Sequence, residues 1–191
     1  PDPDQLRAVA DRLRRAERPL LIAGGGVRYA EAEAALAAFA GRHGIPVAET
    51  QAGKGALPWD HPACVGAIGV CGSSAANALA ADADVVLAIG TRLADFPTGS
   101  RALFQGQGLT LVTLNVAPAD AVKHGALPLV ADARRGLDEL SAALGAWRAA
   151  VPWTETGRRL TAEWTRLVDA ATAYGGDVPA TEAQVIGAVN F

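Results

Sequence analysis

Short runs of uninterrupted apolar residues, each followed by a helical pattern, constrain the fold of this chain more than any other feature. The runs occupy residues 19–23, 45–49, 85–90, 109–116 and 127–131. Polar and apolar residues do not alternate within them, so we expect both faces of each strand to be buried, as in a parallel sheet covered by helices on both sides. Right-handed crossovers between such strands produce a doubly wound α/β domain of roughly 150 residues.

The segments between these runs predict helices. The expected helices span residues 4–17, 29–43, 73–82 and 133–146. The first places apolar side chains three and four residues apart, with charged residues on the opposite face, which is the pattern of a helix on the surface of a sheet. The second has a small-residue packing face rich in alanine and ends at Gly44, because glycine readily adopts the left-handed conformation that follows a helix.

The character of the chain changes after Leu144. The next segment, up to residue 173, contains three of the four tryptophans and more charge, and its pattern is helical. Thr181 and Gln184 then form a capping box ahead of another apolar helix. We therefore expect three parts, namely a domain over residues 1–146, a helical linker over 147–180 and the beginning of a further domain over 181–191.

The overall composition excludes several classes of protein. With 17 basic and 20 acidic residues, the net charge of −3 gives no electrostatic reason to expect a nucleic acid or an acidic membrane as partner. No apolar stretch approaches the roughly 18–20 residues of a membrane span, and the start of the chain does not have the pattern of a signal peptide.

Cys64 and Cys71 suit neither a zinc site nor a disulfide framework, so we expect reduced thiols and a cytoplasmic location. No methionine occurs and residue 1 is proline, so we expect a piece of a longer protein.

Three consecutive glycines, Gly24, Gly25 and Gly26, follow the first expected strand and are candidates for binding a nucleotide. The dinucleotide fingerprint requires a third spaced glycine, where this chain has Tyr29. The fingerprint therefore fails, although a glycine-rich turn into a helix can still hold an anion through free backbone N–H groups. A tight turn without any ligand explains the three glycines equally well.

A long loop, residues 49–62, follows the second expected strand. Ligands bind at the carboxyl ends of strands in parallel sheets, which makes Gln51 and Lys54 candidates for contact with a substrate. Lys54 lies between Gly53 and Gly55, which allow the backbone to approach a ligand closely. The alternative is that Lys54 is simply a solvated lysine in a loop.

Further candidates lie where other segments turn. Gly72 precedes Ser73, which suits the N-cap of a helix. Thr91 and Arg92 leave the end of a central strand, and Arg92 could contact a ligand or form an ion pair with Asp95.

Asn115 and Asp132 also follow expected strands and carry the same ambiguity between ligand contact and local structure. The chain contains no Gly-x-Ser-x-Gly motif, no His-Glu-x-x-His motif and no Walker-type lysine loop. We therefore assign no catalytic residue and no metal ligand within these 191 residues.

Taken together, the order of these motifs resembles the central domain of the acetohydroxyacid synthase-like enzymes, which depend on thiamine diphosphate. The resemblance is carried by the glycines at 24–26, by Gly53-Lys54-Gly55, by Asp60-His61-Pro62, by the glycines at 66, 69 and 72, and by residues 83–92. Within this family, residues 49–62, 66–96 and 123–134 are similar to the trihydroxycyclohexanedione hydrolases of myo-inositol breakdown. The resemblance covers about residues 18–145 and resumes at residue 181.

The resemblance implies a three-layer, Rossmann-like domain with a six-stranded parallel sheet, of the type that holds NAD or FAD elsewhere, and a helical C-terminal extension. It implies a parent enzyme whose missing N- and C-terminal domains hold thiamine diphosphate and Mg²⁺, as a homo-oligomer (a dimer or tetramer). The implied reaction is hydrolytic cleavage of a ring C–C bond. This domain alone would be inactive, and Gln51, Lys54 and Arg92 would lie at the rim of the active site.

The synthase relatives hold FAD in this domain, and two departures argue against FAD here. The loop after Arg92 lacks the second arginine expected there, and Asn115 stands where the relatives have an aspartate. We expect weak FAD binding or none, with a vestigial nucleotide cleft made by Gly24, Gly25, Gly26, Gly72, Thr91 and Arg92. Three alternatives stay open: an FAD-holding acetolactate synthase-like carboligase, a nucleotide-binding module of an electron-transfer protein, and a structural fragment of a parent that has lost activity.

Overall fold

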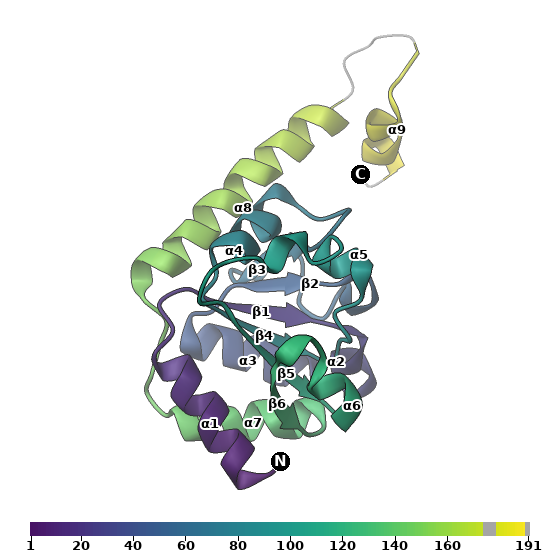
Figure 1. Cartoon of the computed structure of the whole chain (residues 1–191). Helices are drawn as coiled ribbons and strands as arrows, with labels where there is room; N and C mark the ends of the chain where they lie inside the picture. Colours follow the sequence, from purple (N-terminus) through teal and green to yellow (C-terminus); the bar gives the residue numbers. More distant parts are fainter. Residues whose placement is uncertain (174–178, 190–191) are drawn as a thin grey trace.

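Six parallel strands form a single sheet in this computed structural model, which describes residues 1–173 and 179–189 (Figure 1). The strands are β1 (Pro19–Ala23), β2 (Val47–Glu49), β3 (Cys64–Ala67), β4 (Val85–Ile89), β5 (Thr110–Asn115) and β6 (Leu127–Val130). Their order is β3-β2-β1-β4-β5-β6, so the chain reverses its direction across the sheet between β1 and β4. In sheets of this kind, ligands bind at the carboxyl ends of the strands beside the reversal. The expected six-stranded, doubly wound α/β fold is confirmed.

Helices cover both faces of the sheet, and Figure 1 shows them above and below it. One face is covered by α1 (Pro3–Arg14), α3 (Glu33–His43) and α7 (Ala133–Leu144), and the other by α4 (Ser74–Asp82) and the first turns of α8 (Val151–Thr172). Shorter helices follow several strands: α2 (Gly25–Tyr29), α5 (Asp95–Thr98) and α6 (Pro118–Ala121). The C-terminal helix is α9 (Glu182–Val189).

Strand β1 shows why its sequence does not alternate. Leu20 and Ile22 pack into the core beside α4 and α8, whereas Leu21 and Ala23 pack into the core beside α1, α3 and α7. All four side chains are fully buried. A strand between two helical layers must be apolar at every position, which is the property that made this segment recognisable from the sequence.

Two local expectations are corrected by the structure. The helix expected over residues 29–43 begins only at Glu33, as α3, and the separate short helix α2 ends at Tyr29; Glu31, between them, adopts the left-handed conformation with φ of 49° and interrupts the helical backbone. The strand β3 did not stand out as an apolar run. It is only four residues long and contains Gly66, whose φ is 90°.

The C-terminal extension is helical, as expected. The first turns of α8 are anchored by Trp153, whose Nε1 donates to the carbonyl oxygen of Pro19 at 2.8 Å. The rest of α8 extends beyond the sheet, and α9 folds back beside its end (Figure 1).

The capping box is confirmed, since the backbone N–H of Gln184 donates to Thr181 Oγ1 at 3.2 Å and Gln184 Oε1 accepts from the N–H of Thr181 at 2.8 Å. Residues 174–178 and 190–191, parts of the expected linker and further domain, lie outside the described residues.

The end of α3 holds the segment that leads into α8. Three of the hydrogen bonds that join them are donated to carbonyl groups at the end of α3: from Arg148 Nη2 to Gly41 (3.3 Å), from the N–H of Ala149 to His43 (2.8 Å) and from Thr154 Oγ1 to Gly44 (2.7 Å). Because the last carbonyl groups of a helix have no partner within that helix, the segment before α8 and the first turn of α8 supply donors that α3 needs.

A fully buried histidine lies at the centre of this junction. Nδ1 of His43 lies 2.7 Å from the carbonyl oxygen of Trp147, which can only accept, so Nδ1 carries the proton. Nε2 lies 3.0 Å from Ser141 Oγ and accepts from that hydroxyl. Burial lowers the pKa of His43, and the nearby charges of Arg42 and Arg148 lower it further, against the opposing effect of the Trp147 bond. The folded structure therefore favours the neutral ring.

Acidification below the ordinary pKa of histidine is expected to destabilise the fold through His43. The unfolded chain has a histidine pKa of about 6.5, and the folded chain has a lower one. Between these two values the unfolded state binds more protons, so the free energy of unfolding falls as the pH drops, by at most about 1.4 kcal/mol per pH unit. Well above the ordinary pKa the contribution of His43 does not change with pH. Urea unfolding at a series of pH values from about 7.5 down to 5.5 measures this slope.

The matched control replaces a histidine that is not buried. His43→Gln is expected to flatten the slope whatever it does to the absolute stability, whereas His61→Gln, at a partly exposed ring, is expected to retain it. The same slope in wild type and His43→Gln would show that His43 is not the group responsible.

Candidate functional site

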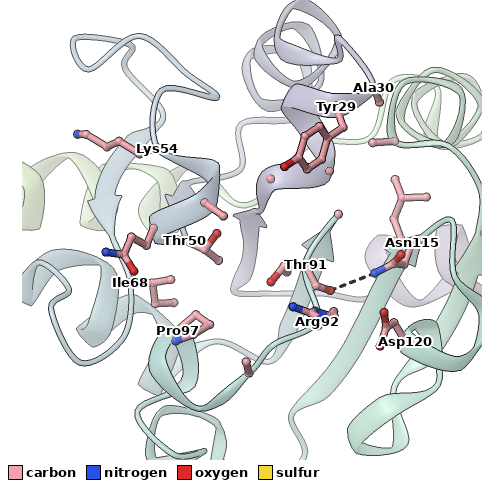
Figure 2. Close-up of a pocket in the computed structure, with 18 of the residues that line it drawn as sticks. Tyr29, Ala30, Thr50, Lys54, Ile68, Thr91, Arg92, Pro97, Asn115 and Asp120 are labelled. Carbon is pink, nitrogen blue, oxygen red and sulfur yellow. Dashed lines mark hydrogen bonds between the residues drawn. The ribbon is translucent and has the colours of Figure 1, made fainter.

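A cavity of about 850 Å³ opens at the carboxyl ends of the strands, beside the reversal between β1 and β4 (Figure 2). Residues in the connections that follow all six strands line it, from Gly25 after β1 to Ala133 after β6. Its volume lies within the range of about 300–1,000 Å³ that is typical of small-molecule sites. The position agrees with the general rule for doubly wound sheets.

Six of the eight residues predicted for the vestigial nucleotide cleft and the active-site rim line this cavity. They are Gly25, Gly26, Gln51, Lys54, Thr91 and Arg92. Gly24 and Gly72 are not among its lining residues. The fold therefore brings residues from the connections after β1, β2 and β4 together around one space, although they are far apart in the sequence.

Two of the three consecutive glycines are needed for close packing between backbones. The N–H of Gly24 donates to the carbonyl of Ile89 (2.8 Å), and the N–H of Gly26 donates to the carbonyl of Gly90 (2.9 Å). A Cβ atom on Gly24 would lie 2.4 Å from the carbonyl oxygen of Gly90, and one on Gly26 would lie 2.6 Å from the Cα of Gly90. These amides are already bonded, which favours the tight-turn interpretation over the anion-binding one.

Gly72 also has a local structural explanation. Its N–H donates to the carbonyl of Gly69 at 2.9 Å, in the turn before α4. The following residue, Ser73, is buried and is the N-cap of α4, as expected: its Oγ accepts from the N–H of Ala76 at 3.0 Å and donates to the carbonyl of Val65 at 2.8 Å. This segment therefore joins β3 to α4 without contributing Gly72 to the cavity.

The carboxyl ends of β4 and β5 are joined by a side chain. Asn115 Nδ2 donates to the carbonyl oxygen of Thr91 at 3.2 Å, as the dashed line in Figure 2 shows. Asn115 Oδ1 accepts from the N–H of Ala117 at 3.1 Å.

The Arg92–Asp95 ion pair considered above does not occur among the described residues, and both side chains are exposed.

Sequence reasoning did not single out several other lining residues. Tyr29 was noted only as the residue that breaks the fingerprint, yet Figure 2 shows its ring above the cavity. Cys71, Phe96 and Asp120 also line the cavity. Each of these three residues follows the carboxyl end of a strand, and this position could have identified it in the sequence. Many residues that do not reach the cavity share the same position, so position alone could not separate the two groups.

The charges around the cavity balance. Lys54 and Arg92 are opposed by Asp120 and Asp132. Asp120 pairs with Lys123, and Asp132 caps α7 by accepting from the N–H of Arg135 at 3.1 Å. Across the described part of the chain, no group of three His, Cys, Asp or Glu side chains is placed to hold a metal ion. The lining thus has no net positive charge to attract a diphosphate and provides no metal centre.

Exposed large apolar side chains occur on several of the connections that follow the strands. Within residues 1–146 they are Tyr29, Trp59, Val70, Phe96, Val116 and Val122, which are between 55% and 93% exposed. Three of them, Tyr29, Phe96 and Val116, line the cavity itself. Clustered exposed apolar surface marks a site of interaction more often than scattered single residues do.

The comparisons with known proteins agree with this architecture. The family described as thiamine pyrophosphate enzyme, central domain, matches residues 6–140. The chain belongs to this family. Across residues 1–173 and 179–189, the structure of the domain contains no helix that is both long and apolar enough to cross a membrane.

Three curated relatives share the name 3D-(3,5/4)-trihydroxycyclohexane-1,2-dione hydrolase. The domain is 42% identical to the protein from Clostridium tetani over 141 residues, 44% identical to that from Geobacillus thermodenitrificans over 145, and 39% identical to that from Halalkalibacterium halodurans over 166. The matches cover 74%, 76% and 87% of this chain but only 22%, 22% and 26% of the relatives. The chain thus spans about a quarter or less of the length of these relatives.

Gly24→Ala is expected to destabilise the domain in the absence of any ligand. The added Cβ atom meets backbone atoms of Gly90 that cannot move away without displacing β4, so we expect a loss of about 2 kcal/mol or more in the free energy of unfolding. Gly41→Ala, in α3, is the control: its Cβ meets no atom within 4 Å, and alanine favours a helix by up to about 1 kcal/mol. Urea unfolding compares the two, and a Gly24→Ala protein as stable as wild type would contradict the packing role.

Proposed function

We propose that this chain is the central domain of a thiamine-diphosphate-dependent trihydroxycyclohexanedione hydrolase, an enzyme that cleaves a ring C–C bond in myo-inositol degradation. The observation that carries the proposal is the identity of 39–44% to relatives of that name across most of the chain. The named relatives are more specific than the family-level match, because all three carry the same enzyme name.

The cofactors would be held by other parts of the parent enzyme. The described residues contain no group of three His, Cys, Asp or Glu side chains placed to hold a metal ion, and the amides of Gly24 and Gly26 in the glycine turn are already bonded. When bound, thiamine diphosphate supplies the carbanion and electron sink for cleavage of the C–C bond, and Mg²⁺ would bind its diphosphate. We therefore expect this chain alone to be inactive.

The role of this domain would be to present its cavity edge to the missing N- and C-terminal domains. The exposed apolar side chains around the cavity suit contact with another protein surface. Gln51, Lys54 and Arg92 would lie at the rim of the active site, where a cation and an amide can orient a polyhydroxylated substrate by hydrogen bonds. The parent would act as a homo-oligomer, a dimer or tetramer, in the cytoplasm.

FAD binding by this domain would be weak or absent. The lining of the cavity has no net positive charge. The loop after Arg92 lacks the second arginine expected from the resemblance to the synthases, and it carries the exposed apolar side chain of Phe96. The balanced charge of the lining and the missing arginine both disfavour the alternative of an FAD-holding acetolactate synthase-like enzyme.

FAD is expected to leave the thermal stability of the 191-residue chain unchanged. A ligand present at 100 times its dissociation constant would add about 2.7 kcal/mol and raise the melting temperature by several degrees. Melting curves with FAD near millimolar concentration, with NAD and ADP as comparisons, measure the effect. A clear rise with FAD alone would favour the synthase alternative over the hydrolase.

Lys54→Ala is expected to lower kcat/KM of the whole enzyme on the cyclic dione by about tenfold or more, because a hydrogen bond from a charged group contributes about 1.5–3 kcal/mol. The control, Arg7→Ala, removes an exposed cation on α1 and is expected to leave kcat/KM unchanged. Wild-type enzyme that carboligates pyruvate but does not hydrolyse the dione would refute the proposed function.

A further inference from the structure

Three local contacts hold the backbone of the loop that carries Gln51 and Lys54. Thr50 Oγ1 accepts from the N–H of Gly53 at 3.1 Å. Gly53 is packed so closely on β1 that a Cβ atom there would lie 2.1 Å from the carbonyl oxygen of Ala23. Arg28 Nη1, from α2, donates to the carbonyl of Lys54 at 3.2 Å. The side chains of Gln51 and Lys54 are exposed, and these contacts fix the backbone that carries them.

The far end of this loop depends on a buried carboxylate. Glu49 is the last residue of β2 and is 3% exposed. Its Oε1 accepts from the N–H of Leu57, a residue that is 2% exposed, at 3.0 Å. A buried backbone N–H must find a partner, and the loop has left the sheet at this point. The Glu49 side chain thus replaces the carbonyl group that a neighbouring strand would otherwise supply.

Glu49 also joins the loop to the exit of the neighbouring strand β3. Its backbone carbonyl accepts from the N–H of Ile68 at 3.0 Å, and Ile68 lines the cavity beside Thr50 and Gln51. One residue therefore connects the end of β2, the loop over residues 50–57 and the exit of β3. A displacement of Glu49 would therefore move both the loop over residues 50–57 and the exit of β3.

Glu49 is an unusual choice for a position that serves only stability. A buried carboxylate loses its hydration, and this loss is offset only by partners of suitable charge and geometry. Within the part of the chain that the structure describes, Glu49 has no ion-pair partner. Its negative charge also raises the pKa of the neighbouring Cys64 thiol, after the larger effect of burial. An apolar residue of similar size would avoid the cost of desolvation but could not bond to Leu57.

We propose that Glu49 is a positioning residue, which fixes the loop over residues 50–57 so that Lys54 and Gln51 are presented at the active-site rim of the assembled enzyme. The inference rests on the proposed function, because it takes the rim role of Lys54 from there. What Glu49 contributes is an acceptor for the N–H of Leu57, and it acts through the loop without touching the substrate.

The test uses three variants of the whole enzyme. Glu49→Met keeps the length and volume of the side chain but removes the acceptor, Glu49→Gln keeps an acceptor oxygen and removes the charge, and Lys54→Ala removes the presented group. We expect Glu49→Met to lower kcat/KM by about tenfold, since small misplacements of positioned groups can lower rates by that factor or more. Glu49→Gln should restore kcat/KM to near the wild-type value.

The combination with Lys54→Ala distinguishes positioning from general destabilisation. If Glu49 acts through Lys54, the double variant Glu49→Met/Lys54→Ala should be little worse than Lys54→Ala alone. Equal losses in Glu49→Gln and Glu49→Met, or additive losses in the double variant, would overturn the proposal. Unchanged kcat/KM in Glu49→Met would do the same.

Hydrogen exchange of the backbone amides in the same proteins provides a readout that does not need turnover. The amide of Leu57 should lose its protection in Glu49→Met and keep it in Glu49→Gln, while amides in β4 stay protected in both. Retained protection at Leu57 in Glu49→Met would overturn the proposal even in an enzyme without activity. A wild-type enzyme that is inactive on the dione would refute the proposed function separately.

Discussion

The close approach of backbones at the carboxyl ends of β1, β2 and β4 is the constraint on which the rest of this structure depends. Gly24 and Gly26 lie against Gly90, and Gly53 lies against Ala23, at separations that leave no room for a side chain. These contacts bring the exits of three strands together at the reversal of the sheet. The cavity exists beside them because the connections must diverge immediately afterwards to reach opposite faces of the sheet.

This constraint changes the meaning of the glycine-rich turn. In a nucleotide-binding domain the free amides of such a turn hold phosphate groups, but here the amides of Gly24 and Gly26 bond to carbonyl groups of β4 and its exit. The helix that follows, α2, is only five residues long, so its dipole is small. The same residues that suggest a nucleotide site in the sequence are therefore sufficient to explain the geometry of the fold without one.

The sequence predicted the architecture well because strands buried on both faces must be apolar at every position, as Leu20 and Leu21 illustrate. It predicted less about the cavity. The sequence places four lining residues near one another because they follow parallel strands: Gln51, Lys54, Thr91 and Arg92. It could not show that Gly24 and Gly72, which also follow strands, do not line the cavity. The break between α2 and α3 was missed because it depends on one non-glycine residue, Glu31, in a left-handed conformation. The role of Glu49 was missed because a glutamate at the end of a strand usually faces solvent.

The location of Glu49 connects the fold to the proposed chemistry. In the proposed function, the loop presents Lys54 to another domain, so it has to leave the sheet and cannot rely on the sheet for its last hydrogen bonds. A long side chain at the end of the preceding strand solves this problem, since it can follow the loop outward while its backbone stays in register with β3. The burial of Ala56 and Leu57 then excludes water that would compete for the same N–H group. Under this proposal the end of β2 fixes the loop, and the exposed side chains of Gln51 and Lys54 remain available for contact with another domain.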